Sequence, residues 1–323
     1  MQYKILGKDL KVSSIGMGCM GISHAYGKPL TKKEGIYLIH KALDYGYNFF
    51  DTAEVYGPYI NEEIVGEALK NHHGEVVIAT KFGVKLEDGS TGMPIANAKS
   101  DIIRKSIEGS LKRLQVDCID LYYQHRIDPK IAPEEVASLM ADLIKEGKIS
   151  HWGISQVDEI YLRRANAICP VTAIQNRYSM MARDYEKLFP VLEELNIGFV
   201  AFSPMANGFL SGKYDKNTKF TTDDYRSKMP QFKADNIDKN KDLINLLASI
   251  AEEKKATLAQ ISMAWMINKK PYIVPIPGTR KAERLQENAK TSEIKLSKQE
   301  VKYIDEVLAK INMSEIFLGT KHD

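Results

Sequence analysis

A short apolar segment followed by a longer amphipathic segment recurs eight times along the chain, and this repeat limits the possible folds more than any other feature. The apolar segments are rich in β-branched and aromatic residues and are bounded by Gly, Ser or Pro, as is typical of buried parallel strands. They comprise residues 15–18, 48–51, 76–81, 119–124, 149–155, 173–176, 198–203 and 272–276. Eight strand–helix units predict an α/β fold of the (β/α)8 TIM-barrel class.

The segments between these strands have the residue spacing of helices. In residues 100–114, Ile103, Ile107 and Leu111 recur at intervals of four residues and give the segment one apolar face. Further helices are expected over residues 34–45, 133–145, 185–195, 241–253, 258–268 and 281–289.

Two segments stand outside the repeat. Near the N-terminus, Gly7 and Asp9 lie between two apolar pairs, which predicts a small β-hairpin that covers the bottom of the barrel. After the seventh strand, residues 205–239 are polar and rich in turn-forming residues. A loop of this length in a compact domain is usually functional, and it would lie at the face where the strands end.

The composition is that of an ordinary globular protein, and we expect residues 1–323 to form a single domain. With 44% hydrophobic and 27% charged residues, a disordered chain is excluded. A net charge of +3 is too small to indicate nucleic acid or a membrane surface as a partner. No apolar stretch approaches the about 18 residues of a membrane helix, and no signal peptide is evident. Three widely spaced cysteines favour a reducing, cytoplasmic environment.

Four side chains that can take part in proton transfer lie at or after the ends of predicted strands. Asp51 and Lys81 end the second and third strands, His125 follows the fourth, and Tyr56 lies in the loop after Asp51. Because strand ends and their loops meet at one mouth of a TIM barrel, we expect these residues to converge. Taken singly, each has a structural explanation: an ion pair, a packed tyrosine or a core histidine. Titratable groups that occur together indicate a site.

This set of groups indicates proton donation to a carbonyl oxygen. A buried Lys81 requires an anionic partner, and Asp51 is the nearest candidate. The Lys81 cation would lower the pKa of Tyr56 from ~10, so that the phenol acts as a general acid. His125 would hold the carbonyl oxygen. The set contains no hydride source, so a redox reaction requires a cofactor.

One dinucleotide-binding motif occurs by chance. Residues 16–21 match G-x-G-x-x-G, but Gly27 and Pro29 follow and no helix is expected before residue 31, which argues against a Rossmann fold. The seven histidines are scattered and lack metal-ligand spacing, so we expect no metal site.

The segment after the eighth strand has the features of an anion site. Gly278 permits close backbone approach, and Arg280 and Arg284 follow at the start of a predicted helix. Positive charge opposes the helix dipole at this end, so an anion such as phosphate is expected there.

Short motifs along essentially the whole chain resemble those of the aldo-keto reductases, especially the bacterial and plant oxidoreductases related to the potassium channel β subunits. The motifs are FDTAEVYG at 50–57, NEE at 61–63, YYQH at 122–125, GIS at 153–155, FSP at 202–204, PGTR at 277–280 and EN at 287–288. The resemblance implies a (β/α)8 barrel that binds NADPH without a Rossmann domain. It also implies a catalytic tetrad of Asp51, Tyr56, Lys81 and His125, with Tyr56 as the proton donor.

The resemblance further implies a cofactor site. Ser155, Gln156 and Gln175 would hold the nicotinamide carboxamide, and Phe202 would pack on the nicotinamide ring. Many relatives carry Asn, Arg or Glu where Gln156 stands. The full set of residues expected to bind the cofactor is Gly18, Cys19, Met20, Asp51, Ser155, Gln156, Gln175, Phe202, Ser203, Pro204, Met205, Asn207, Lys213, Arg226, Gly278, Arg280, Arg284, Glu287 and Asn288.

Within this set the resemblance also separates the residues around the pyrophosphate from those around the 2′-phosphate. The pyrophosphate would meet residues 203–205 and Lys213, and Arg226 would close the long loop over the cofactor. The residues around the adenosine 2′-phosphate would be Gly278, Arg280, Arg284, Glu287 and Asn288. The expected substrate pocket comprises Met20, Ile22, Tyr56, His125 and Trp152.

The resulting hypothesis is NADPH-dependent, reversible reduction of aldehydes or ketones to alcohols, with hydride from the nicotinamide and a proton from Tyr56. One alternative is an NADPH-binding sensor like the channel β subunits, which carry Asn at the position of His125. Another is an aldolase that uses Lys81 to form a Schiff base. The sequence leaves the small-molecule carbonyl substrate and the oligomeric state open.

Overall fold

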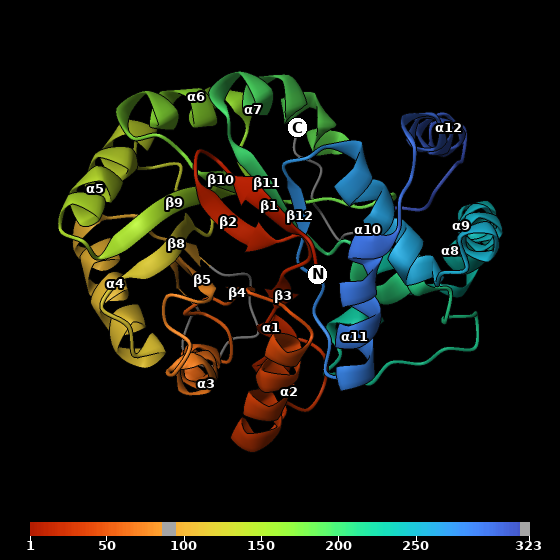
Figure 1. Cartoon of the computed structure of the whole chain (residues 1–323), viewed down its shortest axis with the longest axis horizontal. Helices are drawn as coiled ribbons and strands as arrows, with labels where there is room; N and C mark the ends of the chain where they lie inside the picture. Colours follow the sequence, from red (N-terminus) through yellow and green to blue (C-terminus); the bar gives the residue numbers. More distant parts are fainter. Residues whose placement is uncertain (86–94, 317–323) are drawn as a thin grey trace.

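The computed structural model describes residues 1–85 and 95–316 (Figure 1). Within these residues, one sheet contains eight parallel strands in the order β12-β11-β10-β9-β8-β5-β4-β3. The strands are β3 (Met17–Gly18), β4 (Phe49–Asp51), β5 (Val77–Phe82), β8 (Ile119–Gln124), β9 (Ile149–Ser155), β10 (Ala173–Arg177), β11 (Gly198–Phe202) and β12 (Ile273–Pro275). Hydrogen bonds from Gly16 N to Pro275 O (2.9 Å) and from Gly18 N to Pro277 O (3.3 Å) join the two edges. The predicted TIM barrel is confirmed.

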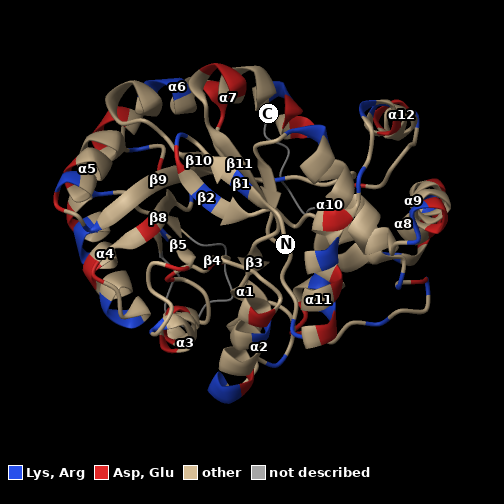
Figure 2. Ribbon diagram, viewed as in Figure 1, with Lys and Arg blue, Asp and Glu red and all other residues tan. Residues whose placement is uncertain are grey.

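The helices form a ring around these strands (Figure 1). The principal ones are α2 (Lys32–Asp44), α3 (Ile60–Leu69), α4 (Ser100–Leu114), α5 (Pro133–Lys145), α6 (Glu159–Ile168), α7 (Phe189–Leu195), α9 (Lys241–Lys254), α10 (Leu258–Lys269), α11 (Ala282–Lys290) and α12 (Lys298–Leu308). Basic and acidic residues are interspersed along these helices (Figure 2). Among the described residues, no helix has the length and apolar character needed to cross a membrane.

Several helices differ from the sequence-based expectation. The helix expected over 185–195 is a 3-10 turn, η1 (Asp184–Leu188), followed by α7, since Pro190 lies in the first turn of α7 and favours a helix start. The short helix α1 (Met20–Ser23) begins before residue 31, so the expectation of no helix there is wrong. The sequence analysis also missed α3, α6 and α12. In α3 the buried residues lie on several sides and give no single apolar face.

The N-terminal hairpin is confirmed. Strands β1 (Tyr3–Leu6) and β2 (Leu10–Ser13) pair antiparallel, and Gly7 turns the chain with a φ of 59°. Leu6 and Leu10 are buried with the side chains that fill the barrel interior, and Leu6 packs against Gly198 at the start of β11. The hairpin therefore covers the end of the barrel at which the parallel strands begin (Figure 1).

The long segment after β11 contains short helical turns rather than an irregular loop. They are η2 (Ala206–Ser211), η3 (Tyr225–Lys228), η4 (Pro230–Phe232) and α8 (Ala234–Lys239). Tyr214, Phe220 and Phe232 form an aromatic cluster with ring centroids 4.9–5.5 Å apart. Tyr225 N donates to Ala25 O over 2.9 Å, which ties this segment to the chain that follows α1. Another small antiparallel pair, β6 (Val84–Lys85) with β7 (Ile95–Ala96), was not predicted.

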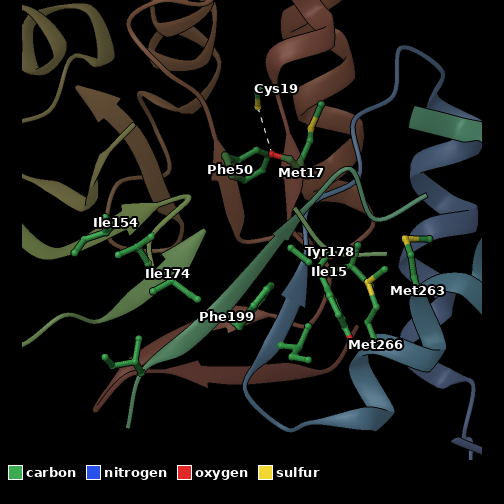
Figure 3. Packing of buried hydrophobic residues seen from close by; sticks show 14 of the residues in the cluster. Ile15, Met17, Cys19, Phe50, Ile154, Ile174, Tyr178, Phe199, Met263 and Met266 are labelled. Carbon is green, nitrogen blue, oxygen red and sulfur yellow. Dashed lines mark hydrogen bonds between the residues drawn. The ribbon is translucent and has the colours of Figure 1, made fainter. Parts of the chain in front are cut away.

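Alternation along the strands decides which side chains enter the barrel. In β8, Leu121 and Tyr123 belong to the interior cluster, whereas Tyr122 packs in the layer between strands and helices. Figure 3 shows part of that outer layer, with Ile154 and Ile174 from adjacent strands. Because side chains on a strand alternate between the two faces, every second residue faces the interior.

Candidate active site

Asp51 and Lys81 form a buried ion pair at the mouth of the barrel. Each lies two residues beyond an interior side chain, Phe49 in β4 and Ala79 in β5, so each faces the same interior space. The Lys81 ammonium lies 2.5 Å from Asp51 Oδ1 and 2.7 Å from Thr52 O. The two side chains are 1% and 3% exposed, so the pair is shielded from water.

Tyr56 and His125 complete the group of four side chains. Lys81 Nζ lies 3.3 Å from Tyr56 Oη and 4.9 Å from the centre of the Tyr56 ring. The His125 ring meets the Tyr56 ring edge-on, with centroids 5.9 Å apart. His125 follows β8 and is held by its backbone N–H, which donates to Phe82 O over 2.9 Å. The structure thus brings the four predicted residues together.

The expected direction of the Tyr56 pKa is wrong. Burial raises the pKa of the Tyr56 phenol above its ordinary value, and Lys81 opposes this increase without cancelling it. The sequence indicates that Lys81 and Tyr56 lie at the same mouth of the barrel, but it does not indicate how deeply the phenol is buried. Desolvation disfavours the phenolate more strongly than the adjacent cation favours it. Tyr56 is therefore a protonated phenol at neutral pH.

The other groups have defined charge states. Burial acts to lower the pKa of Lys81, but Asp51 and Tyr56 oppose it and the net pKa is raised, so Lys81 remains a cation. Burial, together with Arg126 and Lys81, holds the pKa of His125 well below its ordinary value. His125 is therefore a neutral imidazole, and its buried Nδ1 has no hydrogen-bond partner among the described residues. A neutral imidazole can donate one N–H to a carbonyl oxygen.

Gln175 and Ser155 lie beside this group. The two residues are in register on β10 and β9. Gln175 Nε2 donates to Asp51 Oδ2 over 2.7 Å. The Gln175 side chain, which was expected to hold the nicotinamide carboxamide, therefore contacts a member of the predicted tetrad in this structure. Gln156 follows Ser155, and its backbone N–H donates to Gln175 O over 3.1 Å.

Left-handed backbone conformations cluster at the ends of β9 and β11. Gln156, Ser203, Ala206 and Asn207 have φ values of 55°, 50°, 46° and 59°. Such values are uncommon for residues other than glycine and concentrate at ligand sites. The ring of Phe202 is partly exposed directly before Ser203 and packs on the interior cluster. A flat aromatic surface beside constrained backbone turns fits a nicotinamide nucleotide.

In the structure, the residues of the predicted anion site keep the features that suit a phosphate. Gly18 and Gly278 form a bridge, and a Cβ at Gly18 would lie 2.7 Å from Ile276 O, so these two segments require glycine to approach. Arg280 is exposed and donates to Lys28 O over 2.7 Å. Arg284 pairs with Glu287. Guanidinium groups at the start of α11 fit the 2′-phosphate of NADPH.

The segment after β11 contacts the chain after α1. Asn207 Nδ2 donates to Tyr26 Oη over 2.9 Å, and the Arg226 guanidinium lies 5.3 Å from the centre of the Tyr26 ring. Arg226 also pairs with Asp224 over 2.6 Å. The remaining predicted cofactor residues are Lys213, which is exposed, Met205 and Met20, which are half-buried, and Cys19, Pro204 and Asn288, which are buried.

Two predicted pocket residues do not face the mouth. Trp152 lies in the outer layer, fully buried, and its Nε1 donates to Pro170 O over 3.0 Å. It lies an odd number of residues before the inward-facing Ser155, so its side chain is on the opposite face of β9. Ile22 is buried against Gly35 and Ile64 of the surrounding helices. The assignment of Trp152 and Ile22 to the substrate pocket is therefore wrong.

The sequence analysis missed three residues at the mouth. The His24 ring stacks on the Tyr56 ring with centroids 6.2 Å apart. Arg126 directly follows His125, and Arg177 lies two residues after Gln175 on the same face of β10. Each of them lies only a few positions after a predicted site residue in the sequence, namely Met20, His125 and Gln175. This closeness along the chain was the signal that could have identified them.

Comparison with known proteins agrees with this geometry. Residues 14–309 match the Aldo/keto reductase family. Probable aldo-keto reductase 1 from Glycine max is 39% identical over 309 residues, covering 94% of this chain and 88% of that protein. The structure of the glycerol dehydrogenase AKR11B4 from Gluconobacter oxydans matches with a TM-score of 0.87 and 30% identity, over 98% of this chain and 97% of that chain.

A third relative was solved with a nucleotide. The structure of an aldo-keto reductase from Klebsiella pneumoniae in complex with NADPH matches with a TM-score of 0.71 and 25% identity, over 95% of this chain and 96% of that chain. The family match, the relative from Glycine max and the barrel with its buried Asp51–Lys81 pair agree with one another. This chain belongs to the aldo-keto reductase family.

Proposed function

We propose that this protein is an NADPH-dependent reductase of aldehydes or ketones that also catalyses the reverse alcohol oxidation. The observation that carries the proposal is the position of Tyr56 Oη, 3.3 Å from the Lys81 ammonium and beside the neutral His125 imidazole. A protonated phenol next to a fixed cation is suited to donate a proton and to be stabilised as a phenolate afterwards.

Each member of the tetrad has one role. His125 donates an N–H to the carbonyl oxygen and orients it toward Tyr56. Tyr56 transfers its proton to that oxygen as negative charge develops on it. Lys81 stabilises the resulting phenolate, and Asp51 compensates the charge of Lys81 at 2.5 Å. NADPH, when bound, supplies the hydride to the carbonyl carbon.

The residues around the mouth would hold the cofactor in the required orientation. Ser155, Gln156 and Gln175 surround the carboxamide end, and Phe202 packs on the ring. Arg280 and Arg284 hold the 2′-phosphate through charge-assisted hydrogen bonds, which favours NADPH over NADH. The support for this is the cluster of positive φ values at the ends of β9 and β11 and the guanidinium groups at α11.

We also propose that the chain forms one domain, because the strands that close the barrel come from residue 17 through residue 275. The protein acts in the cytoplasm, where Cys19, Cys118 and Cys169 stay reduced, and all three are free thiols in the structure.

The test is the substitution Tyr56→Phe, which removes the proton donor and keeps the ring. Aldehyde-dependent oxidation of NADPH is expected to fall by at least about 100-fold, because general acid catalysis contributes roughly 10²–10⁴-fold. Binding of NADPH, measured by fluorescence titration, is expected to persist. Tyr303→Phe, on the outer face of α12, is the matched control. Activity of Tyr56→Phe near the wild-type level would contradict the proposal.

A further inference from the structure

Two arginines lie on one sector of the rim, above the tetrad. Arg177 ends β10 and shares its face with Gln175, whose amide contacts Asp51. Arg126 directly follows His125, and its Nη1 donates to His125 O over 2.6 Å. The same nitrogen lies 3.5 Å from Ser155 Oγ. Ser155 and Gln175 are in register on neighbouring strands, so Arg126 and Arg177 lie on the same part of the rim.

The two arginines share the same aromatic neighbours. The charge of Arg126 acts on Tyr56, Tyr185 and Tyr225. The charge of Arg177 acts on Tyr185 and Tyr225 as well. Tyr185 comes from η1 and Tyr225 from η3 in the long segment after β11, so both arginines lie near residues of two separate segments.

The environment of Arg126 differs from that of most arginines in this protein. Seven others pair with a carboxylate: Arg104, Arg113, Arg163, Arg164, Arg183, Arg226 and Arg284. Arg126 forms no ion pair with a carboxylate of residues 1–85 and 95–316, and its guanidinium donates to the backbone oxygen of His125 and to the hydroxyl of Ser155. Arg177 is only 8% exposed, and the charge of Asp184 acts on it.

A partly buried cation of this kind favours an anionic ligand. Removing a guanidinium from water is costly, and an oxyanion that accepts its hydrogen bonds offsets this cost. Arginine binds carboxylate and phosphate through two parallel N–H donors, which gives orientation as well as affinity. Arg280, at the expected phosphate end of the cofactor site, likewise donates to a backbone oxygen, that of Lys28.

We propose that Arg126, on the part of the rim that also carries Arg177, forms an anion subsite for the substrate, and that the preferred substrates are aldehydes or ketones carrying a carboxylate or phosphate. This inference rests on the proposed reductase function and names its substrate class. The carbonyl group would lie against Tyr56 and His125. The anionic end would lie against Arg126, one residue beyond His125, so a short spacer would join the two groups.

The experiment compares substrates that differ in charge. For the carboxylate, 4-carboxybenzaldehyde is paired with methyl 4-formylbenzoate, which is neutral. For the phosphate, glyceraldehyde 3-phosphate is paired with glyceraldehyde. The wild-type enzyme with NADPH is expected to show a higher kcat/KM on the anionic member of at least one pair, and the pair that responds identifies the anion. Equal kcat/KM within both pairs would overturn the inference.

Variants then locate the preference. Arg126→Gln is expected to lower the ratio of anionic to neutral kcat/KM by about 10- to 100-fold, as for a lost hydrogen bond to a charged group. Arg126→Lys is expected to restore part of the ratio that Arg126→Gln loses. The lysine returns the charge without the planar fork of the guanidinium, so kcat/KM on the anionic substrate rises because its KM falls. Arg164→Gln, which breaks a surface ion pair with Glu134, is expected to leave the ratio unchanged. An unchanged ratio in Arg126→Gln would overturn the inference.

A binding measurement separates this inference from the proposed function. The alcohol 4-(hydroxymethyl)benzoate and its methyl ester are titrated by calorimetry into the protein with NADP⁺. The carboxylate is expected to bind more tightly, and Arg126→Gln is expected to remove the difference. Reduction of the neutral aldehydes without any preference for the anionic ligands would leave the reductase function standing and reject the subsite. Preferential binding without turnover would support the subsite and reject the reductase function.

Discussion

Gln175 Nε2 donates a hydrogen bond to Asp51 Oδ2 over 2.7 Å, although the two residues lie 124 positions apart in the sequence. Asp51 Oδ1 accepts from Lys81 at the same time. Both carboxylate oxygens are therefore satisfied without water, which is the condition under which a buried charge persists. The orientation of Lys81 toward Tyr56 depends on this fixed carboxylate.

Breaking the Asp51–Lys81 pair from one side is expected to destabilise the protein strongly. Lys81→Met leaves the Asp51 carboxylate buried without its cation, and removing one partner of a buried pair typically costs about 3–5 kcal/mol. The double variant Asp51→Asn with Lys81→Met leaves no buried charge and is expected to recover most of this free energy of unfolding. Urea denaturation of the single and double variants measures the coupling. If the double variant regains stability but has no activity, the pair serves catalysis. If the losses in free energy of unfolding of the two single variants simply add in the double variant, the two residues are not coupled.

Glu54 is expected to make stability depend on pH. Burial, with a contribution from Glu62, raises the pKa of Glu54 to about 7, above the value of 4.5 in an unfolded chain. The folded protein then binds more protons between these values, so the stabilising contribution is present below pH 4.5 and is lost as pH rises through about 7. The free energy of unfolding of Glu54→Gln relative to wild type is expected to increase between pH 5 and about pH 8, since the amide cannot ionise.

The matched control for this pH effect is Glu63→Gln, an exposed position on α3. Its stability relative to wild type is expected to stay constant over the same range. Chemical denaturation at several pH values is the measurement. A relative stability of Glu54→Gln that does not change with pH would show that the Glu54 carboxyl titrates normally in the folded protein.

Arg280 is expected to determine the choice between NADPH and NADH. Arg280→Met removes a guanidinium at the start of α11 and is expected to weaken NADPH binding by about 10- to 100-fold, as for loss of a charge-assisted hydrogen bond to phosphate. NADH lacks the 2′-phosphate, so its affinity is expected to change little. Fluorescence titration with both nucleotides tests this. An equal loss of affinity for NADPH and NADH would show that Arg280 does not act through the 2′-phosphate.

Gly153 is expected to tolerate no side chain. A Cβ there would lie 2.4 Å from both Ala173 O and the Tyr123 ring, inside the filled barrel. Gly153→Ala is expected to lower the free energy of unfolding by roughly 1–3 kcal/mol or more through overpacking. Gly21→Ala is the matched control, because its Cβ would first meet Tyr26 at 3.5 Å, an ordinary contact. Thermal denaturation distinguishes the two, and equal melting temperatures would contradict the packing argument.

The pKa of Tyr56 illustrates what pattern alone could not supply. The sequence correctly indicated that a lysine would lie beside the phenol, at the end of the next strand. Whether the pKa rises or falls depends on the balance between Lys81 and burial, and burial prevails. Trp152 shows the same limit: a one-residue difference in position on β9 separates the mouth from the outer layer, and only strand register resolves it.

The elements themselves were determined locally. The strands at 119–124 and 149–155 and the helices at 100–114 and 133–145 match their predicted bounds, because apolar periodicity and helix-start residues act over a few positions. Contacts between distant residues, such as Gln175 with Asp51 and Arg126 with Ser155, appear only once the barrel closes. The sequence thus determined the eight strands of the barrel, most of the helices around them and the residues at the strand ends. The tertiary structure decided which of them meet, how deeply they are buried and what charge they carry, since these depend on register and desolvation.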